Sequence, residues 1–123
     1  MRLIISKVTD HPWLLQVGRS FYPDILKFGV RVYEYDKGVN HAKTVLMDEG
    51  WFSIGSANFD NRSMRLNFEL NLFIHCPAEA GVVEAMMLED FSKSHEITYD
   101  PGRKISFLQR LGEAALRPLA PLL

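Results

Sequence analysis

Residues 41–71 read HAKTVLMDEGWFSIGSANFDNRSMRLNFELN. Within this stretch one residue separates His41 from Lys43, four separate Lys43 from Asp48, and six separate Asp48 from the GSAN segment at residues 55–58. The apolar run that follows is typical of a strand, on which positions i and i+2 share a face, so we expect His41 and Lys43 to point the same way. Lysine is not a zinc ligand, so this spacing does not indicate a zinc pair.

The side chains in this pattern form the set that a phosphate ester requires. Ser56 and Asn58 follow a glycine, where a ligand can approach the backbone, and their short polar groups can hydrogen-bond an anion. Lys43 adds a fixed positive charge, and His41 can either attack phosphorus or protonate a departing alkoxide. The sequence therefore predicts a phosphate site built from these four residues.

Two carboxylates of the stretch have candidate roles beside this site. Glu69 lies on the polar face of an expected strand at residues 68–74, and a carboxylate there can hold the imidazole of His41 in one tautomer. Asp48 follows a strand at a tight turn, so it is either a turn residue or part of the catalytic set. The residues alone leave both roles of Asp48 open.

The rest of the chain alternates strand-like and helix-like segments. Apolar or alternating patterns predict strands at residues 3–5, 30–35, 42–47, 51–55 and 68–74. Helices are expected over residues 10–20, over residues 23–28 with a glycine cap at Gly29, and from Pro77 to Phe91. The stripe of the last helix, expected in the core, consists of Ala80, Val83, Met87, Leu88 and Phe91. Strands interleaved with helices predict an α/β layered domain.

The composition is that of one globular domain, because 47% of the 123 residues are hydrophobic and 24% are charged. We therefore expect a single domain over residues 1–123. The 14 basic and 15 acidic side chains give a net charge of −1, which disfavours nucleic acid as a partner. Cys76, the single cysteine, is expected to be a small buried apolar residue.

The sequence predicts no membrane-spanning segment, because no apolar run approaches about 18 to 20 residues. It also predicts no cleavable signal peptide, because the start MRLIISKVTD does not have the layout of one. Contact of this chain with a membrane would therefore be peripheral. One candidate element is an amphipathic helix at residues 103–123, which carries more basic than acidic side chains. Such a helix either lies on anionic lipid or packs on the domain, with its basic stems covering the edge.

The central motif resembles that of the phospholipase D superfamily. Residues 41–58 match its pattern H-x-K-x4-D-x6-G-S-x-N at every specified position. Four flanking segments are similar to the carboxy-terminal half of bacterial cardiolipin synthases: TDHP at 9–12, GRSFYPDILKFGVRVYEY at 18–35, ANFDNRSMRLNFELN at 57–71 and the ending LRPLAPLL. The resemblance implies an α/β fold, a layered α-β-α half-domain with a mixed β-sheet.

The resemblance also implies an activity and a role for each motif residue. In that family two such motifs meet at one site and move a phosphatidyl group from phosphatidylglycerol to a second lipid through a phosphohistidine, without cofactor or metal. The resemblance implies that His41 is the general acid and base rather than the nucleophile, with Asp48 completing the catalytic motif. It implies that Lys43, Ser56 and Asn58 bind phosphate oxygens. Glu69 matches the family's downstream acid, which orients an active-site histidine.

The chain departs from the family's pattern because it holds a single motif, at residues 41–58. We expect it to lack the first half and the strand and helix that open the second half. A complete site would then need the missing amino-terminal half or a second copy as a homodimer. The resemblance implies phosphatidylglycerol as substrate, a membrane surface as partner, and the bacterial cytoplasmic membrane as location. The alternatives are a phospholipase D-type hydrolase or nuclease of phosphodiesters, and an inactive fragment that needs its partner half.

Overall fold

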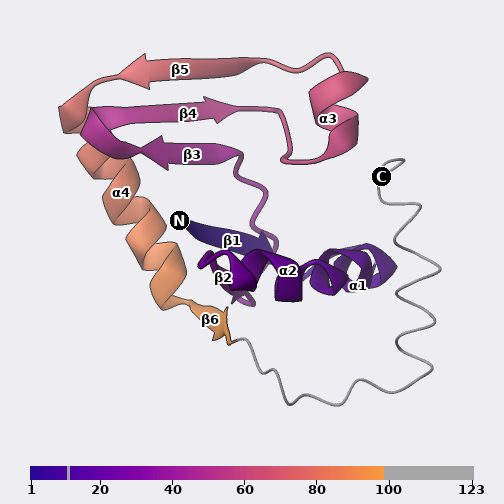
Figure 1. Cartoon of the computed structure of the whole chain (residues 1–123). Coiled ribbons are helices and arrows are strands. Elements are labelled where there is room, and N and C mark those ends of the chain that lie inside the picture. The colour runs from indigo at the N-terminus through magenta and orange to yellow at the C-terminus, as the bar shows by residue number, and fades with distance from the viewer. Residues whose placement is uncertain (11, 99–123) are drawn as a thin grey trace. The chain divides into compact units, whose positions relative to one another are not determined.

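The computed structural model of the chain describes residues 1–10 and 12–98 (Figure 1). The elements in chain order are β1 (Arg2–Ser6), α1 (Pro12–Ser20), α2 (Tyr22–Lys27), β2 (Arg31–Tyr35), β3 (Thr44–Met47), the 3-10 turn η1 (Asp48–Gly50), β4 (Trp51–Gly55), α3 (Asn61–Arg65), β5 (Asn71–His75), α4 (Pro77–Ser92) and β6 (Ser94–Ile97). The expected α/β class is confirmed. None of the helices in the described part of the chain is long and apolar enough to cross a bilayer. The amphipathic helix expected at residues 103–123 lies outside the described residues.

The chain divides into two compact units. Unit 1 holds Met1–Asn40 and the described residues from Lys93 onward, and unit 2 holds His41–Ser92. Each unit has its own three-stranded sheet, with the order β1-β2-β6 in unit 1 and β3-β4-β5 in unit 2. The motif at residues 41–58 therefore lies entirely in unit 2.

The sheet of unit 1 is mixed, as expected from the sequence. β1 runs parallel to β2, and β2 runs antiparallel to β6. The chain between the parallel strands contains α1 and α2, which is the helical crossover that a parallel pair requires. Val32 of β2 is fully buried, and Val17 of α1 and Tyr22 of α2 are also buried. Strands and helices thus both contribute to the core of unit 1.

The predicted start, break and end of this helical crossover are present. α1 begins at Pro12 and ends at Ser20, and α2 follows with Pro23 in its first turn. Proline is tolerated there because the N–H groups of a first turn have no partner within the helix. Gly29 has a φ of 76°, in the left-handed region that favours glycine. β2 begins two residues later, at Arg31.

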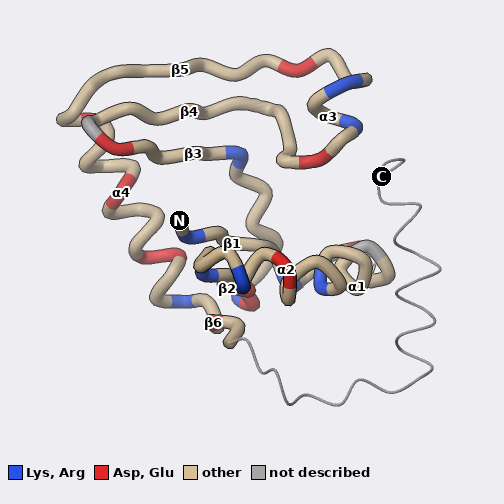
Figure 2. The backbone as a smooth tube through the Cα atoms, in the orientation of Figure 1, with Lys and Arg blue, Asp and Glu red and all other residues tan. Residues whose placement is uncertain are grey.

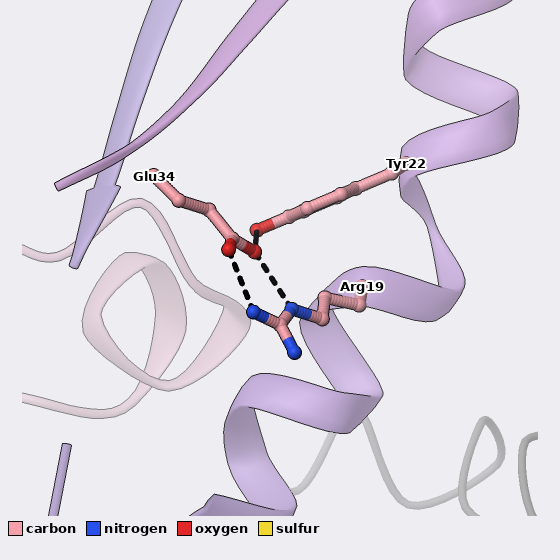
Figure 3. Close-up of polar contacts among 3 residues, drawn as sticks. All are labelled: Arg19, Tyr22 and Glu34. Atoms are coloured by element: carbon pink, nitrogen blue, oxygen red, sulfur yellow. Dashed lines mark hydrogen bonds and ion pairs between the residues drawn. The ribbon is translucent and has the colours of Figure 1, made fainter. Parts of the chain in front are cut away.

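An ion pair between half-exposed Arg19 and buried Glu34 ties the crossover to β2 (Figure 3). Arg19 of α1 donates from Nε to Oε1 of Glu34 at 2.7 Å and from Nη2 to Oε2 at 2.6 Å. The hydroxyl of Tyr22 donates to Oε1 of Glu34 at 3.2 Å. The side chain of Glu34 is only 5% exposed, yet the hydrogen bonds from Arg19 hold the pKa of Glu34 below its ordinary value against the opposing effect of burial. Burial and the neighbouring carboxylate raise the pKa of Tyr22.

The sheet of unit 2 is antiparallel throughout, and α4 packs against one of its faces. The core between sheet and helix consists of Phe52, Ala80, Val83, Leu46, Ile74, Cys76 and Met87. Cys76 packs against this apolar core as predicted, but it is partly buried rather than buried. Leu88 is exposed, which corrects its place in the predicted stripe. The next position after Met87 is turned by about 100° around a helix, away from the sheet.

β5 is shorter than the alternating pattern predicted. It begins at Asn71 rather than at Phe68. The last ladder residue of β4 is Gly55, which lies opposite Asn71, so the residues before Asn71 have no partner strand in this sheet. Phe68 and Leu70, expected on the apolar face of the strand, are consequently exposed.

Two short elements were not expected from the sequence pattern. α3 begins after Asp60, whose side chain accepts the N–H of Ser63 at 2.6 Å and so caps the helix. β6 pairs with β2, where Arg31 and Glu96 form an exposed ion pair at 2.7 Å. Both elements are only four or five residues long. A hydrophobic period is not detectable in so short a segment.

Candidate functional site

The two halves of the motif meet at one end of the β3-β4 pair. The strands run antiparallel with Thr44 opposite Ile54, so the residue before β3 lies beside the last residue of β4. The N–H of Gly55 donates to the carbonyl oxygen of Lys43 at 3.2 Å. The structure thus places Lys43 next to the GSAN segment at residues 55–58, as the predicted phosphate site requires.

His41 and Lys43 precede the strand on which the alternation placed them. β3 begins at Thr44, so the strand predicted over residues 42–47 is wrong at its first two positions. The ladder between β3 and β4 ends at the pair of Thr44 and Ile54, and beyond it a backbone bond from the N–H of Gly55 to the carbonyl oxygen of Lys43 reaches this segment. His41 and Lys43 are joined instead by a hydrogen bond from Nζ of Lys43 to the carbonyl oxygen of His41 at 2.8 Å. An ammonium group has three protons, so two of them stay available for a ligand.

Ser56 and Glu69 form a hydrogen-bonded pair in the same loop region. Oγ of Ser56 donates to Oε2 of Glu69 at 2.6 Å and accepts the N–H of Leu70 at 3.0 Å. The N–H of Ser56 donates to the carbonyl oxygen of Leu70 at 3.0 Å. Nδ2 of Asn67 donates to Oε1 of Glu69 at 3.1 Å. Each carboxylate oxygen of Glu69 therefore accepts a hydrogen bond from a neighbouring side chain.

These contacts favour the charged form of Glu69. The hydrogen bond from Ser56 does most to hold the pKa of Glu69 below its ordinary value, and the bond from Asn67 adds to it. The hydroxyl of Ser63 and the positive charge of Lys43 act in the same direction more weakly. Oγ of Ser63 is buried and makes no hydrogen bond of good geometry among the described residues, so its dipole can orient toward the carboxylate. Glu69 is consequently ionised at neutral pH.

The structure shows no hydrogen bond between Glu69 and His41 among the described residues. Within residues 1–10 and 12–98, the side-chain hydrogen bonds of Glu69 come from Ser56 and Asn67, and none joins it to His41. His41 is exposed. The histidine-orienting role of Glu69 stays a prediction.

Asn58 and Asp48 occupy different places relative to Lys43. Asn58 is exposed in the loop between β4 and α3, two residues after Ser56. Asp48 is exposed in η1, at the other end of β3 from Lys43. Five steps along an extended chain separate the two residues, a distance of about 16 Å. The structure therefore gathers Lys43, Ser56 and Glu69 with the loop of Asn58, and of the two roles left open for Asp48 it favours the turn.

Asn71 supports the loop in a way that the sequence pattern does not reveal. Its Oδ1 accepts the N–H of Ala57 at 3.3 Å. A Cβ at Gly55 would overlap this side-chain amide and the carbonyl oxygen of Leu70, so the close approach requires glycine. The sequence argument assigned the space beside Gly55 to a ligand, and the structure assigns it to Asn71. In the sequence, Gly55 indicates a close approach at this position, but nothing indicates that Asn71 is the residue that approaches.

The site combines charges of both signs. The positive charge of Lys43 acts on the carboxylate of Glu69. α3 adds Arg62 and Arg65, and blue segments mark basic residues on this helix in Figure 2. No group of three or more His, Cys, Asp and Glu side chains suited to a metal ion occurs among the described residues. The groups of this region that can act on an anion are the ammonium group of Lys43, the amide of Asn58 and the imidazole of His41.

The fold and the motif define the class of the protein. An α/β chain whose H-x-K and G-S-x-N segments meet at one sheet end matches the phospholipase D-like pattern expected from the sequence. The family described as "Cardiolipin synthase, PLD-like domain" matches residues 1–91. The chain belongs to this family, and the resemblance stated from the motif is confirmed.

Curated relatives match along all 123 residues. The chain is 37% identical to "Cardiolipin synthase" of Geobacillus kaustophilus (strain HTA426) and covers 24% of that protein. It is 39% identical to "Cardiolipin synthase A" of Pseudomonas fluorescens (strain SBW25) and 33% identical to "Cardiolipin synthase" of Clostridium perfringens (strain SM101 / Type A), covering 26% of each. The chain thus spans about a quarter of the length of these relatives. No solved structure matches it.

Proposed function

We propose that this chain supplies one of the two motifs of a phosphatidyltransferase of cardiolipin synthase type. The observation that carries the proposal is the meeting of Lys43 with the GSAN segment in a member of this family. The ammonium group of Lys43 and the amide of Asn58 would bind the non-bridging oxygens of a phosphodiester and stabilise the charge that grows in the transition state. Ser56 belongs to the same loop, and its hydroxyl is engaged with Glu69.

His41 would act as general acid and base. The histidine of the second motif would attack phosphorus in phosphatidylglycerol, forming a P–N bond while the P–O bond to glycerol breaks. His41 would give its proton to the departing glycerol oxygen. It would then take the proton from the hydroxyl of a second phosphatidylglycerol as that oxygen attacks the phosphohistidine and displaces the other histidine. The exposure of His41 supports this role, because its ring is accessible to a second motif.

A partner that carries the second motif is part of the proposal. It would be the missing amino-terminal half or a second copy of this chain as a homodimer. The relatives support it by their length, since this chain covers 24% of the Geobacillus kaustophilus protein. Unit 2 supports it as well, because it exposes several large apolar side chains near the motif, and exposed apolar surface marks interaction sites. The large apolar side chains that are more than half exposed between Ser56 and Asn71 are Phe59, Met64, Leu66, Phe68 and Leu70.

The substrate would be a phospholipid, phosphatidylglycerol, at the surface of the bacterial cytoplasmic membrane. The relatives are named cardiolipin synthases, which supports this lipid chemistry. A net charge of −1 gives no broad field for the phosphates of a nucleic acid. The reaction as proposed uses no cofactor and no metal ion.

The test is a chimera in which this chain replaces the matching segment of the Geobacillus kaustophilus relative. On phosphatidylglycerol vesicles we expect cardiolipin and glycerol as products, resolved by mass spectrometry. The matched control carries His41→Ala in the same chimera. It should keep the circular dichroism spectrum of the chimera and lose turnover, because the leaving glycerol then has no proton donor.

Other products would identify the alternatives. Phosphatidic acid without cardiolipin would show a hydrolase, because water has then replaced the lipid as acceptor. Cleavage of a nucleic acid without any lipid product would contradict both lipid activities. A folded chimera that is inactive beside an active parent would contradict a working motif in this chain and support an inactive segment.

A further inference from the structure

The hydroxyl of Ser56 has no proton left for a phosphate. A serine hydroxyl has one proton to donate and two lone pairs. In the structure Oγ of Ser56 gives its proton to Oε2 of Glu69 at 2.6 Å, and one lone pair accepts the N–H of Leu70 at 3.0 Å. The non-bridging oxygens of a phosphodiester are acceptors and need donors. The remaining lone pair of Ser56 would repel such an oxygen rather than bind it.

The charge of the Glu69 carboxylate also disfavours phosphate binding by Ser56. It is ionised, and it lies directly against Ser56. An anion that took the hydroxyl proton of Ser56 would leave the carboxylate without its main hydrogen bond and with a like charge beside it. The pair is therefore more stable intact than opened for a phosphate oxygen.

We propose that Ser56 and Glu69 are a positioning pair that holds the GSAN loop for the anion, and that neither side chain contacts the phosphate. The proposal deepens the proposed function, on which its phosphate ligand rests. Lys43 and Asn58 are then the groups that bind the anion, because the N–H groups of residues 55–57 already donate within the protein.

The hydrogen bonds of the loop show how the pair transmits its effect. The segment at residues 55–57 is held to Lys43 through the N–H of Gly55 and to Leu70 through the N–H and Oγ of Ser56. Asn71 holds the N–H of Ala57. Asn58 is the next residue and is exposed. The pair thus fixes the chain immediately before Asn58 and beside Lys43.

The first measurement is the titration of the Glu69 carboxyl carbon by nuclear magnetic resonance in the full chain, without any ligand. Ser56→Ala should raise the pKa of Glu69 toward its ordinary value of 4.5, because the largest contribution to the lowered value is lost. Ser56→Thr keeps the hydroxyl and should preserve the low pKa. Gly81→Ala in α4, where an added Cβ meets nothing within 4 Å, is the matched control and should leave the pKa of Glu69 in place. A pKa that responds to His41→Ala and not to Ser56→Ala would overturn the proposal.

The second measurement is the affinity for inorganic phosphate, followed through the backbone amide signals of residues 55–58. Ser56→Ala should weaken binding by about 3–10-fold, the effect of one net hydrogen bond. In an Asn58→Ala background the same change should cost less than about 2-fold, because the group that Ser56 positions is gone. Equal losses in both backgrounds would overturn the proposal by showing that Ser56 is an independent ligand. Ser56→Thr should bind phosphate as the parent chain does.

The two measurements separate the pair from the proposed function. Phosphate that shifts none of the signals of Lys43 and residues 55–58 would contradict the proposed phosphate site. The titration of Glu69 would still decide whether Ser56 and Glu69 act as a pair. An unchanged pKa of Glu69 in Ser56→Ala would overturn the pair even if phosphate binds.

Discussion

Gly55 and Asn71 lie opposite each other at the end of the β4-β5 ladder, so close that a Cβ at Gly55 would overlap the side-chain amide of Asn71. The same amide accepts the N–H of Ala57 at 3.3 Å. Glycine at this position therefore allows the polar side chain of β5 to reach across and hold the loop that follows β4.

Gly55→Ala should destabilise the chain by about 1–3 kcal/mol, because the added methyl group must displace backbone and an amide that is already bonded. Urea denaturation measures the loss. The matched control is Gly81→Ala in α4 of the same unit, where a Cβ meets nothing within 4 Å. This control should stabilise the chain by about 0.5–1 kcal/mol, since alanine is the better helix former. Equal stability of the two variants would contradict the close approach of Asn71 to Gly55.

Arg19→Leu should destabilise the chain by about 1–3 kcal/mol, because it leaves the buried carboxylate of Glu34 without its main partner. We place the cost below that of breaking a fully buried pair, because the Arg19 side chain is 44% exposed and water can partly replace it. The control is Arg31→Leu, which removes a similar two-bonded contact to Glu96 on an exposed surface. The Arg31 variant should lose clearly less stability in the same denaturation experiment. A larger loss in the Arg31 variant would refute the importance of burial here.

Acid should weaken the folded chain partly through Glu34. Its pKa is lower in the folded chain than in the unfolded chain, so its contribution to stability is fully present above an ordinary value near 4.5 and is lost as the pH falls through the lowered pKa. Denaturation at about pH 7 and at about pH 3 brackets this range. The parent should lose more stability between the two pH values than Glu34→Gln, which cannot titrate. Identical losses would show that Glu34 contributes nothing to acid unfolding.

Lys43→Ala in the chimera should lower kcat by about 10²–10³-fold, the effect of removing one group that stabilises a growing negative charge. Steady-state kinetics on phosphatidylglycerol vesicles measures it. Lys27→Ala is the control, since Lys27 is an exposed lysine of α2 whose nearest carboxylate, on Asp24, is 3.9 Å away. The control should keep the kcat of the parent chimera. Normal turnover in Lys43→Ala would remove Lys43 from the proposed site.

Local patterns predicted the positions of most elements in unit 1 because the deciding signals are short in range. Pro12, Pro23 and Gly29 mark the start, break and end of the helical crossover, and each acts through its own backbone. The ion pair between Arg19 and Glu34 was not predictable in this way. The two residues are 15 positions apart in the chain, and no local pattern indicates which charge meets a buried carboxylate.

In unit 2 the motif spacing alone determined that Lys43 and the GSAN segment meet. β3 and β4 pair antiparallel around the tight turn that contains Asp48. Residues equally far from the turn on the two strands are therefore neighbours, which brings Lys43 beside Gly55. The lengths of the strands were not determined by alternation, because a strand ends where its partner leaves the sheet. Phe68 falls outside its predicted strand for this reason, whereas Lys43 falls outside its own because the ladder between β3 and β4 ends at Thr44.

What only the tertiary structure decided is where the single proton of Ser56 goes. The sequence shows a serine beside a glycine and a glutamate further along, and each residue has a plausible partner of its own in a phosphate and a histidine. The ladder of β4 and β5 brings Leu70 back to Ser56, and with it the carboxylate of Glu69, 13 residues away in the chain. A hydroxyl has one proton, and the acceptor that folding places at 2.6 Å takes it.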